Sequence, residues 1–417
     1  MYLCDIKWLY CAVKRPMVTY GSLVWWKKIE QAQSKLALGK LQRLACLCIT
    51  SAMRSTPTAA METLLNLPPL DIVIRGEARM GAYRLHQNNL WKGQPYDHSK
   101  IILTVSDPVL IMGSDHMTVK TSFNKSIKAG INMPDHDWVK HETELLSKGC
   151  LVWYTDGSKT DVGSGAGIHG VRPKVDISIP LGKHASVYQT EIYAIYTCAE
   201  ENLRRGYHGN AIHIFSDSQA AIKAINSFQV KSRLTWECQQ TLLKLALHNR
   251  VHLEWVPGHK GIAGNERADE LARRGSATPF TGPEPVVGIS KSEAKLTVQR
   301  WTVQRHLTHW ANVSGQNHSK RMMPGPTSSL TAEFIRLNRR QARMVTGLLT
   351  GHSCLRKHLY NMGIYRQSPV CRLCGEGEET AAHGIFDCNA LLQSRVSIIG
   401  TQNPREKLIQ HNLSKGF

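Results

Sequence analysis

Four carboxylates in the middle of the chain occur in settings that could bring them together: Asp156, Glu191, Asp217 and Asp269. The first and third each end a predicted strand, whereas the second and fourth lie in the early turns of predicted helices. Four like charges can gather at one point only with counter-ions, because repulsion and desolvation would otherwise neutralise some of them. Oxygen ligands suit Mg²⁺ or Mn²⁺. Two such ions about 4 Å apart can promote phosphodiester cleavage.

Taken singly, each acid also has an ordinary structural interpretation. An aspartate after a strand, such as Asp156, is commonly a turn residue. Glu191 can complement the dipole of its helix, and Asp217 can cap the helix that follows it. The metal-site hypothesis therefore depends on the four residues occurring together.

The segment 150–275 predicts an α/β domain with a mixed five-stranded sheet. Strand-like runs cover 151–158, 163–170, 175–181, 211–215 and 251–256. The first three are joined by turn residues and are expected to form antiparallel hairpins. Helical spacing covers 186–204, 219–225, 232–247 and 265–275, with Ser186 as a predicted N-cap. Such an order places the carboxylates at strand ends and in first helical turns.

Four motifs of this segment resemble the ribonuclease H family. They are Tyr154-Thr-Asp-Gly-Ser, Gln189-Thr-Glu-Ile-Tyr-Ala-Ile, Phe215-Ser-Asp-Ser-Gln-Ala-Ala and Val256-Pro-Gly-His-Lys-Gly-Ile-Ala-Gly-Asn-Glu-Arg-Ala-Asp. The resemblance implies a ribonuclease H-like fold and hydrolysis of the RNA strand of an RNA/DNA hybrid. It also implies that Asp156, Glu191, Asp217 and Asp269 hold two Mg²⁺ or Mn²⁺ ions.

The resemblance extends to a loop histidine and to substrate contacts. His259 matches a mobile-loop histidine that helps proton transfer or product release, and neighbouring glycines would permit its movement. Alternatively, His259 is a loop residue that contacts phosphate. Ser186 keeps a hydroxyl where the family places one on a phosphate, and Gln189 is a candidate for a groove contact.

Two positions depart from the family pattern. Three and four residues before the catalytic glutamate, the family often has Asn or Gln, whereas this chain has Tyr188 and Val187. Because the 2′-hydroxyl marks the RNA strand, this change bears on selectivity for the hybrid over other duplexes.

A second constellation, Cys371-x2-Cys374-x8-His383-x4-Cys388, has the donors of a tetrahedral zinc shell. It resembles the C-terminal Cys-Cys-His-Cys element of non-LTR (LINE/jockey-like) retrotransposon polyproteins. Thr350-Gly-His-Ser before it, and Thr56-Pro and Leu67-Pro-Pro-Leu near the N-terminus, fit the same pattern. On this resemblance, residues 1–100 are the end of a reverse transcriptase whose catalytic core, with its paired aspartates, is absent.

The chain thus divides into five predicted segments. They are a helical remnant at 1–100, a connector at 101–149, the ribonuclease H domain at 150–275, a linker with an amphipathic helix at 276–330, and a basic helical segment with the zinc-knuckle-like element at 331–417. Further helices are expected over 31–50, 58–65, 71–87 and 331–349. The last carries a basic face that could bind nucleic acid or be only a solvated surface, formed by Arg336, Arg339, Arg340 and Arg343.

Charge and cysteine usage limit the partners and the compartment. The formal net charge is +20, and Lys and Arg exceed Asp and Glu by 7 in residues 1–149, by 3 in 150–275 and by 10 in 276–417. Such an excess favours a nucleic-acid partner, although a merely soluble basic protein is the alternative. The eleven cysteines do not resemble a disulfide framework, so we expect an intracellular location, in the nucleus or the cytoplasm. No signal peptide or membrane span is expected.

The sequence therefore predicts a metal-dependent endonuclease that hydrolyses the RNA strand of RNA/DNA hybrids, from a retrotransposon-derived protein. The expected partners are the hybrid, other nucleic acid through the basic tail, and possibly a reverse transcriptase, with no membrane contact. The alternative is a catalytically silent nucleic-acid-binding relic of a mobile element.

Overall fold

The computed structural model describes residues 2–87, 101, 108–123, 126–131 and 137–399. The chain forms two compact units. The central unit is Met80–Val298, and the helical unit combines Met1–Arg79 with Gln299–Phe417. Helices α6 (Leu70–Gln87) and α13 (Lys291–Asn312) each contribute to both units.

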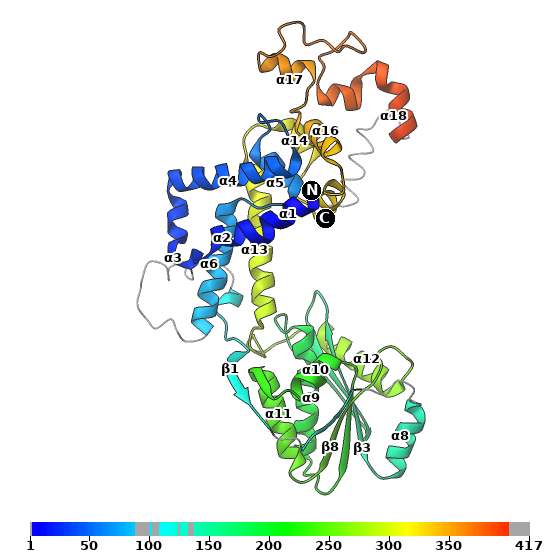
Figure 1. Cartoon of the computed structure of the whole chain (residues 1–417). Helices are drawn as coiled ribbons and strands as arrows, with labels where there is room; N and C mark the ends of the chain where they lie inside the picture. Colours follow the sequence, from blue (N-terminus) through cyan, green and yellow to red (C-terminus); the bar gives the residue numbers. More distant parts are fainter. Residues whose placement is uncertain (1, 88–100, 102–107, 124–125, 132–136, 400–417) are drawn as a thin grey trace. The chain divides into compact units, whose positions relative to one another are not determined.

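A mixed six-stranded sheet forms the middle of the central unit, in the order β2-β8-β6-β3-β4-β5 (Figure 1). The strands are β2 (Lys128–Gly130), β3 (Leu151–Lys159), β4 (Ser164–Arg172), β5 (Val175–Pro180), β6 (Ala211–Ser216) and β8 (Arg250–Trp255). Strands β3, β6, β8 and β2 pair in parallel, whereas β3, β4 and β5 are antiparallel. All five predicted strands are present. The sixth, β2, comes from the predicted connector and is too short to show a periodic pattern.

Helices cover both faces of this sheet (Figure 1). On one face lie α9 (Val187–Arg204), α10 (Gln219–Ile225) and α11 (Arg233–Ala246), packed on a core that includes Trp153 and Ile214. On the other face lie α8 (Trp138–Ser147) and α12 (Ala263–Ala277), packed around Tyr154 and Phe215. Successive strand residues point to opposite faces, so the unbroken apolar runs serve both cores.

Chain on either side of the predicted domain also belongs to the central unit. Strand β1 (His116–Thr121) pairs with β7 (Gln229–Ser232) in a separate two-stranded ribbon. The backbone N–H of Asp115 donates to the carbonyl of Ile289 (3.0 Å), which joins the segments that precede and follow the sheet. A short 3₁₀ helix, η3 (Pro108–Leu110), lies just before this contact.

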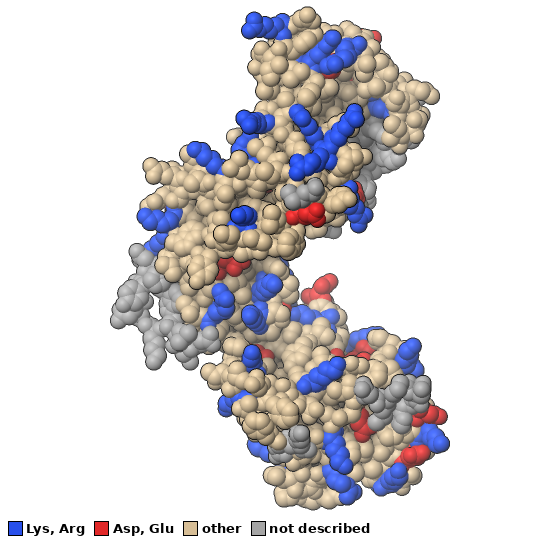
Figure 2. Space-filling model, viewed as in Figure 1, with Lys and Arg blue, Asp and Glu red and all other residues tan. Residues whose placement is uncertain are grey.

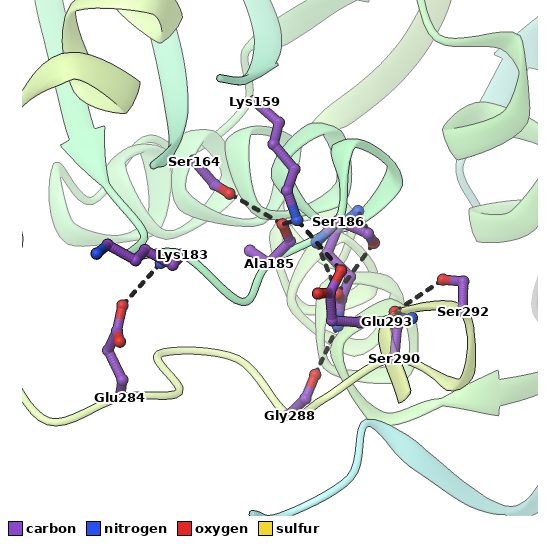
Figure 3. A network of polar contacts seen from close by, with 11 residues as sticks. Lys159, Ser164, Lys183, Ala185, Ser186, Glu284, Gly288, Ser290, Ser292 and Glu293 are labelled. Carbon is purple, nitrogen blue, oxygen red and sulfur yellow. Dashed lines mark hydrogen bonds and ion pairs between the residues drawn. The ribbon is translucent and has the colours of Figure 1, made fainter. Parts of the chain in front are cut away.

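Residues 284–293, which lie in the predicted linker segment 276–330, are bonded to other parts of the central unit (Figure 3). The backbone N–H of Lys183 donates to Oε1 of Glu284 (2.7 Å), and Lys159 Nζ lies 3.3 Å from Oε2 of Glu293. The apolar side chains of Val287 and Ile289 are buried. We call residues 284–293 the clasp.

The helical unit is built from both ends of the chain. Its elements are α1 (Leu3–Leu9), η1 (Tyr10–Lys14), α2 (Arg15–Thr19), α3 (Ser22–Trp25), η2 (Trp26–Glu30), α4 (Ala32–Thr50), α5 (Thr58–Leu65), α14 (Asn317–Met322), α15 (Ser328–Phe334), α16 (Arg339–Thr350), α17 (Arg356–Asn361), η4 (His383–Asp387), η5 (Asn389–Leu391) and α18 (Leu392–Ile399). Met61 and Leu64 share one core with Trp310 and Phe334. Among the described residues, no helix combines the length and the apolar character that crossing a bilayer requires.

The helix predicted over 331–349 is wrong in one respect, because the structure has two helices there, α15 and α16. Asn338 starts the second helix: its side chain accepts from the backbone N–H of Gln341, whose side chain accepts from the N–H of Asn338. This reciprocal cap satisfies N–H groups that would otherwise lack partners, and it favours a helix start within the apolar pattern.

Candidate metal-dependent active site

The pairing of β3 with β6 brings two aspartates side by side. The strands are parallel, and their pairing ends with Thr155 opposite Ser216, so Asp156 and Asp217 follow directly at the same place. Asp156 is buried, with 7 % of its surface exposed. The prediction that Asp156 ends its strand is wrong, because β3 continues to Lys159 in antiparallel pairing with β4, whereas Asp217 does follow the end of β6.

Helix α9 supplies the third carboxylate. A Cβ atom at Gly157 would lie 2.5 Å from the backbone nitrogen of Glu191, so only glycine after Asp156 lets this helix approach so closely. Ligand oxygens of Asp156, Glu191 and Asp217 all lie within 4.8 Å of one another. This spacing allows the three side chains to share bound cations.

Asp269 lies on α12 beside this group. Its carboxylate raises the pKa of Asp156, which shows that the two are close. Asp269 also forms a 2.6 Å ion pair with Arg273, one helical turn further on. The structure therefore brings the fourth predicted carboxylate to the edge of the trio, where an arginine already offsets part of its charge.

The electrostatics of the trio fit a divalent cation. Burial, followed by the charges of Asp217 and Asp269, raises the pKa of Asp156 to about 8. Burial and then Asp156 raise the pKa of Glu191 well above its ordinary value. Oε2 of Glu191 is buried without a hydrogen-bond partner among the described residues. A cation would satisfy this oxygen and allow the acids to ionise together, and oxygen ligands of this kind suit Mg²⁺ or Mn²⁺.

His259 lies in the loop between β8 and α12. Its side chain is 77 % exposed, and its Nδ1 is 4.0 Å from Oδ2 of Asp269. The backbone there has a positive φ of 55°, and Gly261 follows with 75°. A Cβ at Gly258 would lie 2.6 Å from Oδ2 of Asp217, so glycine permits the loop to pass close to the carboxylates. The structure thus places His259 at the solvent side of the site.

Asn265 belongs to the site but was not singled out from the sequence. It is buried in the first turn of α12, and its side chain forms a hydrogen bond with Asp217 that lowers the pKa of that carboxyl, although burial gives a net rise. Asn265 lies four residues before Asp269, so both project from one face of the helix. The four-residue separation from Asp269 could have identified Asn265 as a site residue from the sequence alone.

The two predicted substrate contacts on α9 have internal partners. Ser186 is the N-cap, and its hydroxyl and backbone N–H both donate to Oε1 of Gln189 (3.0 Å each). Gln189 is fully buried, and its amide donates to the carbonyl of Gly288 in the clasp (2.7 Å). The structure therefore assigns Gln189 to packing and not to a groove contact, because the capping box and the clasp use both ends of its amide.

The four residues of the second constellation also converge. Cys371 Sγ is 3.9 Å from Cys388 Sγ, Cys374 Sγ is 3.2 Å from His383 Nε2, and all four ligand atoms lie within 4.8 Å of one another. Backbone N–H groups of Glu376 and Gly377 lower the pKa of Cys374 to about 6. Three sulfurs and one imidazole match a structural zinc shell, and a thiolate is the form that binds zinc.

The predicted basic face is divided between two elements. Arg339, Arg340 and Arg343 are exposed on α16, whereas Arg336 is exposed in the connection before it. Figure 2 shows Lys and Arg side chains spread over the visible face of the helical unit, with few acidic side chains among them. The charge needed to bind a polyanion is therefore at the surface.

The segment that holds the carboxylates also matches a known protein family. Residues 148–277 match the family model described as RNase H. This range holds the carboxylate trio, Asp269 and His259, as well as every strand of the main sheet except β2. The predicted mixed α/β, ribonuclease H-like fold class with helical flanking regions is confirmed.

Proposed function

We propose that this protein is a metal-dependent endonuclease that hydrolyses the RNA strand of RNA/DNA hybrids. The observation that carries the proposal is the convergence of Asp156, Glu191 and Asp217 within a segment that matches the RNase H family. A structural cluster of acids would not place two buried carboxylates beside a half-buried third without compensating charge.

Different residues of the site would bind the metal ions, orient the ligands and transfer protons in such a reaction. Asp156, Glu191, Asp217 and Asp269 would hold two Mg²⁺ or Mn²⁺ ions, which activate water and stabilise the leaving oxygen when bound. Asn265 orients Asp217 through its hydrogen bond, and Arg273 holds Asp269. His259, exposed beside Asp269, is placed to accept or donate a proton at the solvent side.

The flanking regions support binding rather than chemistry in this proposal. The Cys371, Cys374, His383 and Cys388 cluster would hold zinc, and the arginines of α16 would bind nucleic-acid phosphates. All eleven cysteines are free, which supports an intracellular location in the nucleus or cytoplasm. The zinc-type element supports descent from a retrotransposon and a reverse transcriptase as a partner.

The decisive experiment is cleavage of a hybrid labelled on its RNA strand, with Mg²⁺ or Mn²⁺, beside single-stranded RNA, double-stranded RNA and double-stranded DNA. We expect cleavage of the hybrid alone. Asp217→Asn removes a ligand charge and should lower the rate by at least about 100-fold, because even outer partners of metal ligands are worth 10- to 100-fold. Lys174→Gln, a charge change on a turn away from the carboxylates, serves as control.

Two outcomes would count against the proposal. Equal rates for the wild type and Asp217→Asn would refute the metal assignment. Binding of the hybrid without cleavage by the wild type would favour the second candidate, a catalytically silent nucleic-acid-binding relic. The exposed basic residues of the helical unit would support binding in that case.

A further inference from the structure

Glu254, near the end of β8, is a buried carboxylate surrounded by histidines. It is 6 % exposed, and its ion pairs are with His141, His213 and His252. The distances to its oxygens are 2.7 Å from His213 Nδ1, 3.3 Å from His141 Nε2 and 3.9 Å from His252 Nδ1. Although burial raises the pKa of Glu254, hydrogen bonds and charge from His213 and His141 lower it overall, so the cluster favours an ionised carboxylate.

Strand register brings these residues to one face of the sheet. His213 lies opposite His252, and Phe215 lies opposite Glu254, in the parallel pairing of β6 with β8. Phe215 packs with Tyr154 on the side covered by α8, from which His141 projects. Three elements far apart in the sequence therefore contribute to one cluster.

The donor set is that of a transition-metal site. Ligand atoms of His213, His252 and Glu254 all lie within 4.8 Å of one another. Donors around a tetrahedral zinc ion are about 3.4 Å apart, given bond lengths of about 2.1 Å. The carboxylate-to-imidazole distances lie on either side of this value: 2.7 Å for His213, as a hydrogen bond that a bound ion would replace, and 3.9 Å for His252. Imidazole with a carboxylate suits zinc and its neighbours and does not suit Mg²⁺.

One adjustment is required for a shared ion. The rings of His213 and His252 are stacked, with centroids 4.4 Å apart and planes at 14°, so their lone pairs do not converge. The side chain of His252 is 24 % exposed, compared with 9 % for His213. His252 therefore has room to turn toward the carboxylate.

We propose that His213, His252 and Glu254 bind a zinc-class divalent ion. The ion joins strands β6 and β8, and the contact of His141 with the same carboxylate ties helix α8 to the site, so the bound ion stabilises the central unit. Three protein ligands leave the fourth position of a tetrahedral shell to water. This site uses none of the carboxylate trio and does not depend on the nuclease function proposed above.

The test counts tightly bound metal in the full chain. Protein stripped with EDTA is titrated with Zn²⁺, and separately with Co²⁺, in excess Mg²⁺ so that the carboxylate trio does not contribute. We expect two ions in the wild type, one at the cysteine cluster and one here. The cysteine cluster is distinguished by thiolate-to-cobalt charge-transfer absorption, which an imidazole and carboxylate shell lacks.

Single substitutions show which cluster binds each of the two ions. His252→Ala, at a half-exposed position, should lose one ion and the zinc-induced rise in the melting temperature of the central unit, while the thiolate band stays. Cys371→Ser should lose the other ion and the thiolate band. His248→Ala is the matched control, because His248 also contacts another histidine ring, at 5.0 Å from His208, and it lies outside the cluster. It should keep both ions.

The outcome that overturns the proposal is equally specific. If His252→Ala and His213→Gln both fold, by circular dichroism, and retain the metal content and cobalt spectrum of the wild type, the cluster binds no ion. A fall of at least about 100-fold in affinity for the second ion in either variant supports the site.

Discussion

At the scale of single residues, Asp156 couples protons, metal and stability. Its pKa is raised from 3.8 to about 8 by burial and by neighbouring carboxylates. Between these values the folded, ion-free protein binds more protons than the unfolded chain does. The contribution of Asp156 to stability is therefore greatest at low pH and falls as the pH rises through this window. Bound divalent ions replace the protons and remove the repulsion.

We therefore expect the melting temperature of EDTA-treated protein to fall between about pH 5 and pH 8, and added Mg²⁺ to raise it more at pH 8 than at pH 5. Thermal unfolding followed by circular dichroism measures both effects. Asp156→Asn is the control, because it cannot titrate and should show a flatter pH dependence. Identical pH profiles for the two proteins would contradict the assignment of the raised pKa to this site.

At the scale of elements, close contact between α12 and β4 sets the position of the site. Gly167 pairs with Asp156 across β3 and β4. A Cβ atom at Gly167 would lie 2.1 Å from the carbonyl oxygen of Ala268 and 2.4 Å from the nitrogen of Ala272. Because both atoms are backbone, the whole helix would have to move. Helix α12 carries Asp269, so its displacement would change the site.

Gly167→Ala should destabilise the protein by about 1–3 kcal/mol, the usual cost of overpacking. It should also lower the rate of hybrid cleavage. Urea denaturation and the cleavage assay measure the two effects. Gly113→Ala is the matched control, since no described atom lies within 4 Å of a Cβ there, and it should change stability by less than about 0.5 kcal/mol. Equal stability of the two variants would show that α12 is free to shift.

At the scale of the whole molecule, the family-matched range is shorter than the unit that folds around it. The match covers 148–277, whereas the central unit is Met80–Val298. The clasp buries Ile289 and accepts a hydrogen bond from Gln189, two residues before Glu191 of the carboxylate trio. The start of α9 therefore depends on chain outside the matched range.

A fragment of residues 148–277 should be less stable than one of 80–298 by roughly 2–4 kcal/mol, since it loses several hydrogen bonds of about 1 kcal/mol each and buried apolar surface. Urea denaturation of the two fragments measures this difference. Glu284→Gln in the longer fragment, which removes charge but keeps the chain, should cost less than the truncation. Equal urea midpoints for both fragments would show that the clasp does not contribute to stability.

The helical unit also depends on contacts between segments that are far apart in the sequence. Thr331 donates a hydrogen bond to the carbonyl of Leu64 (3.0 Å), and Ser55 Oγ lies 3.0 Å from His358 Nε2. Residues near the start of the chain thus share a core and polar contacts with residues more than 250 positions later. No local pattern encodes such a partnership, because periodicity shows which face is apolar and not what covers it.

The sequence by itself determined the elements and the reactive groups. Strand patterns that include Asp156 or stop just before Asp217, helix starts before Glu191 and Asp269, and the spacing of the three cysteines with His383 follow from local propensity and ligand chemistry. These features are local, so they can be identified within short windows of sequence.

Only the tertiary structure decided which groups meet and which are used internally. Strand order made Asp156 and Asp217 neighbours, the capping box and the clasp removed Gln189 from the surface, and the register of β6 with β8 placed His213 and His252 against Glu254. Each of these results depends on pairing between segments distant in the chain. The physical reason is that a side chain's partners are set by packing between elements, whereas its own sequence neighbours set only the element in which it lies.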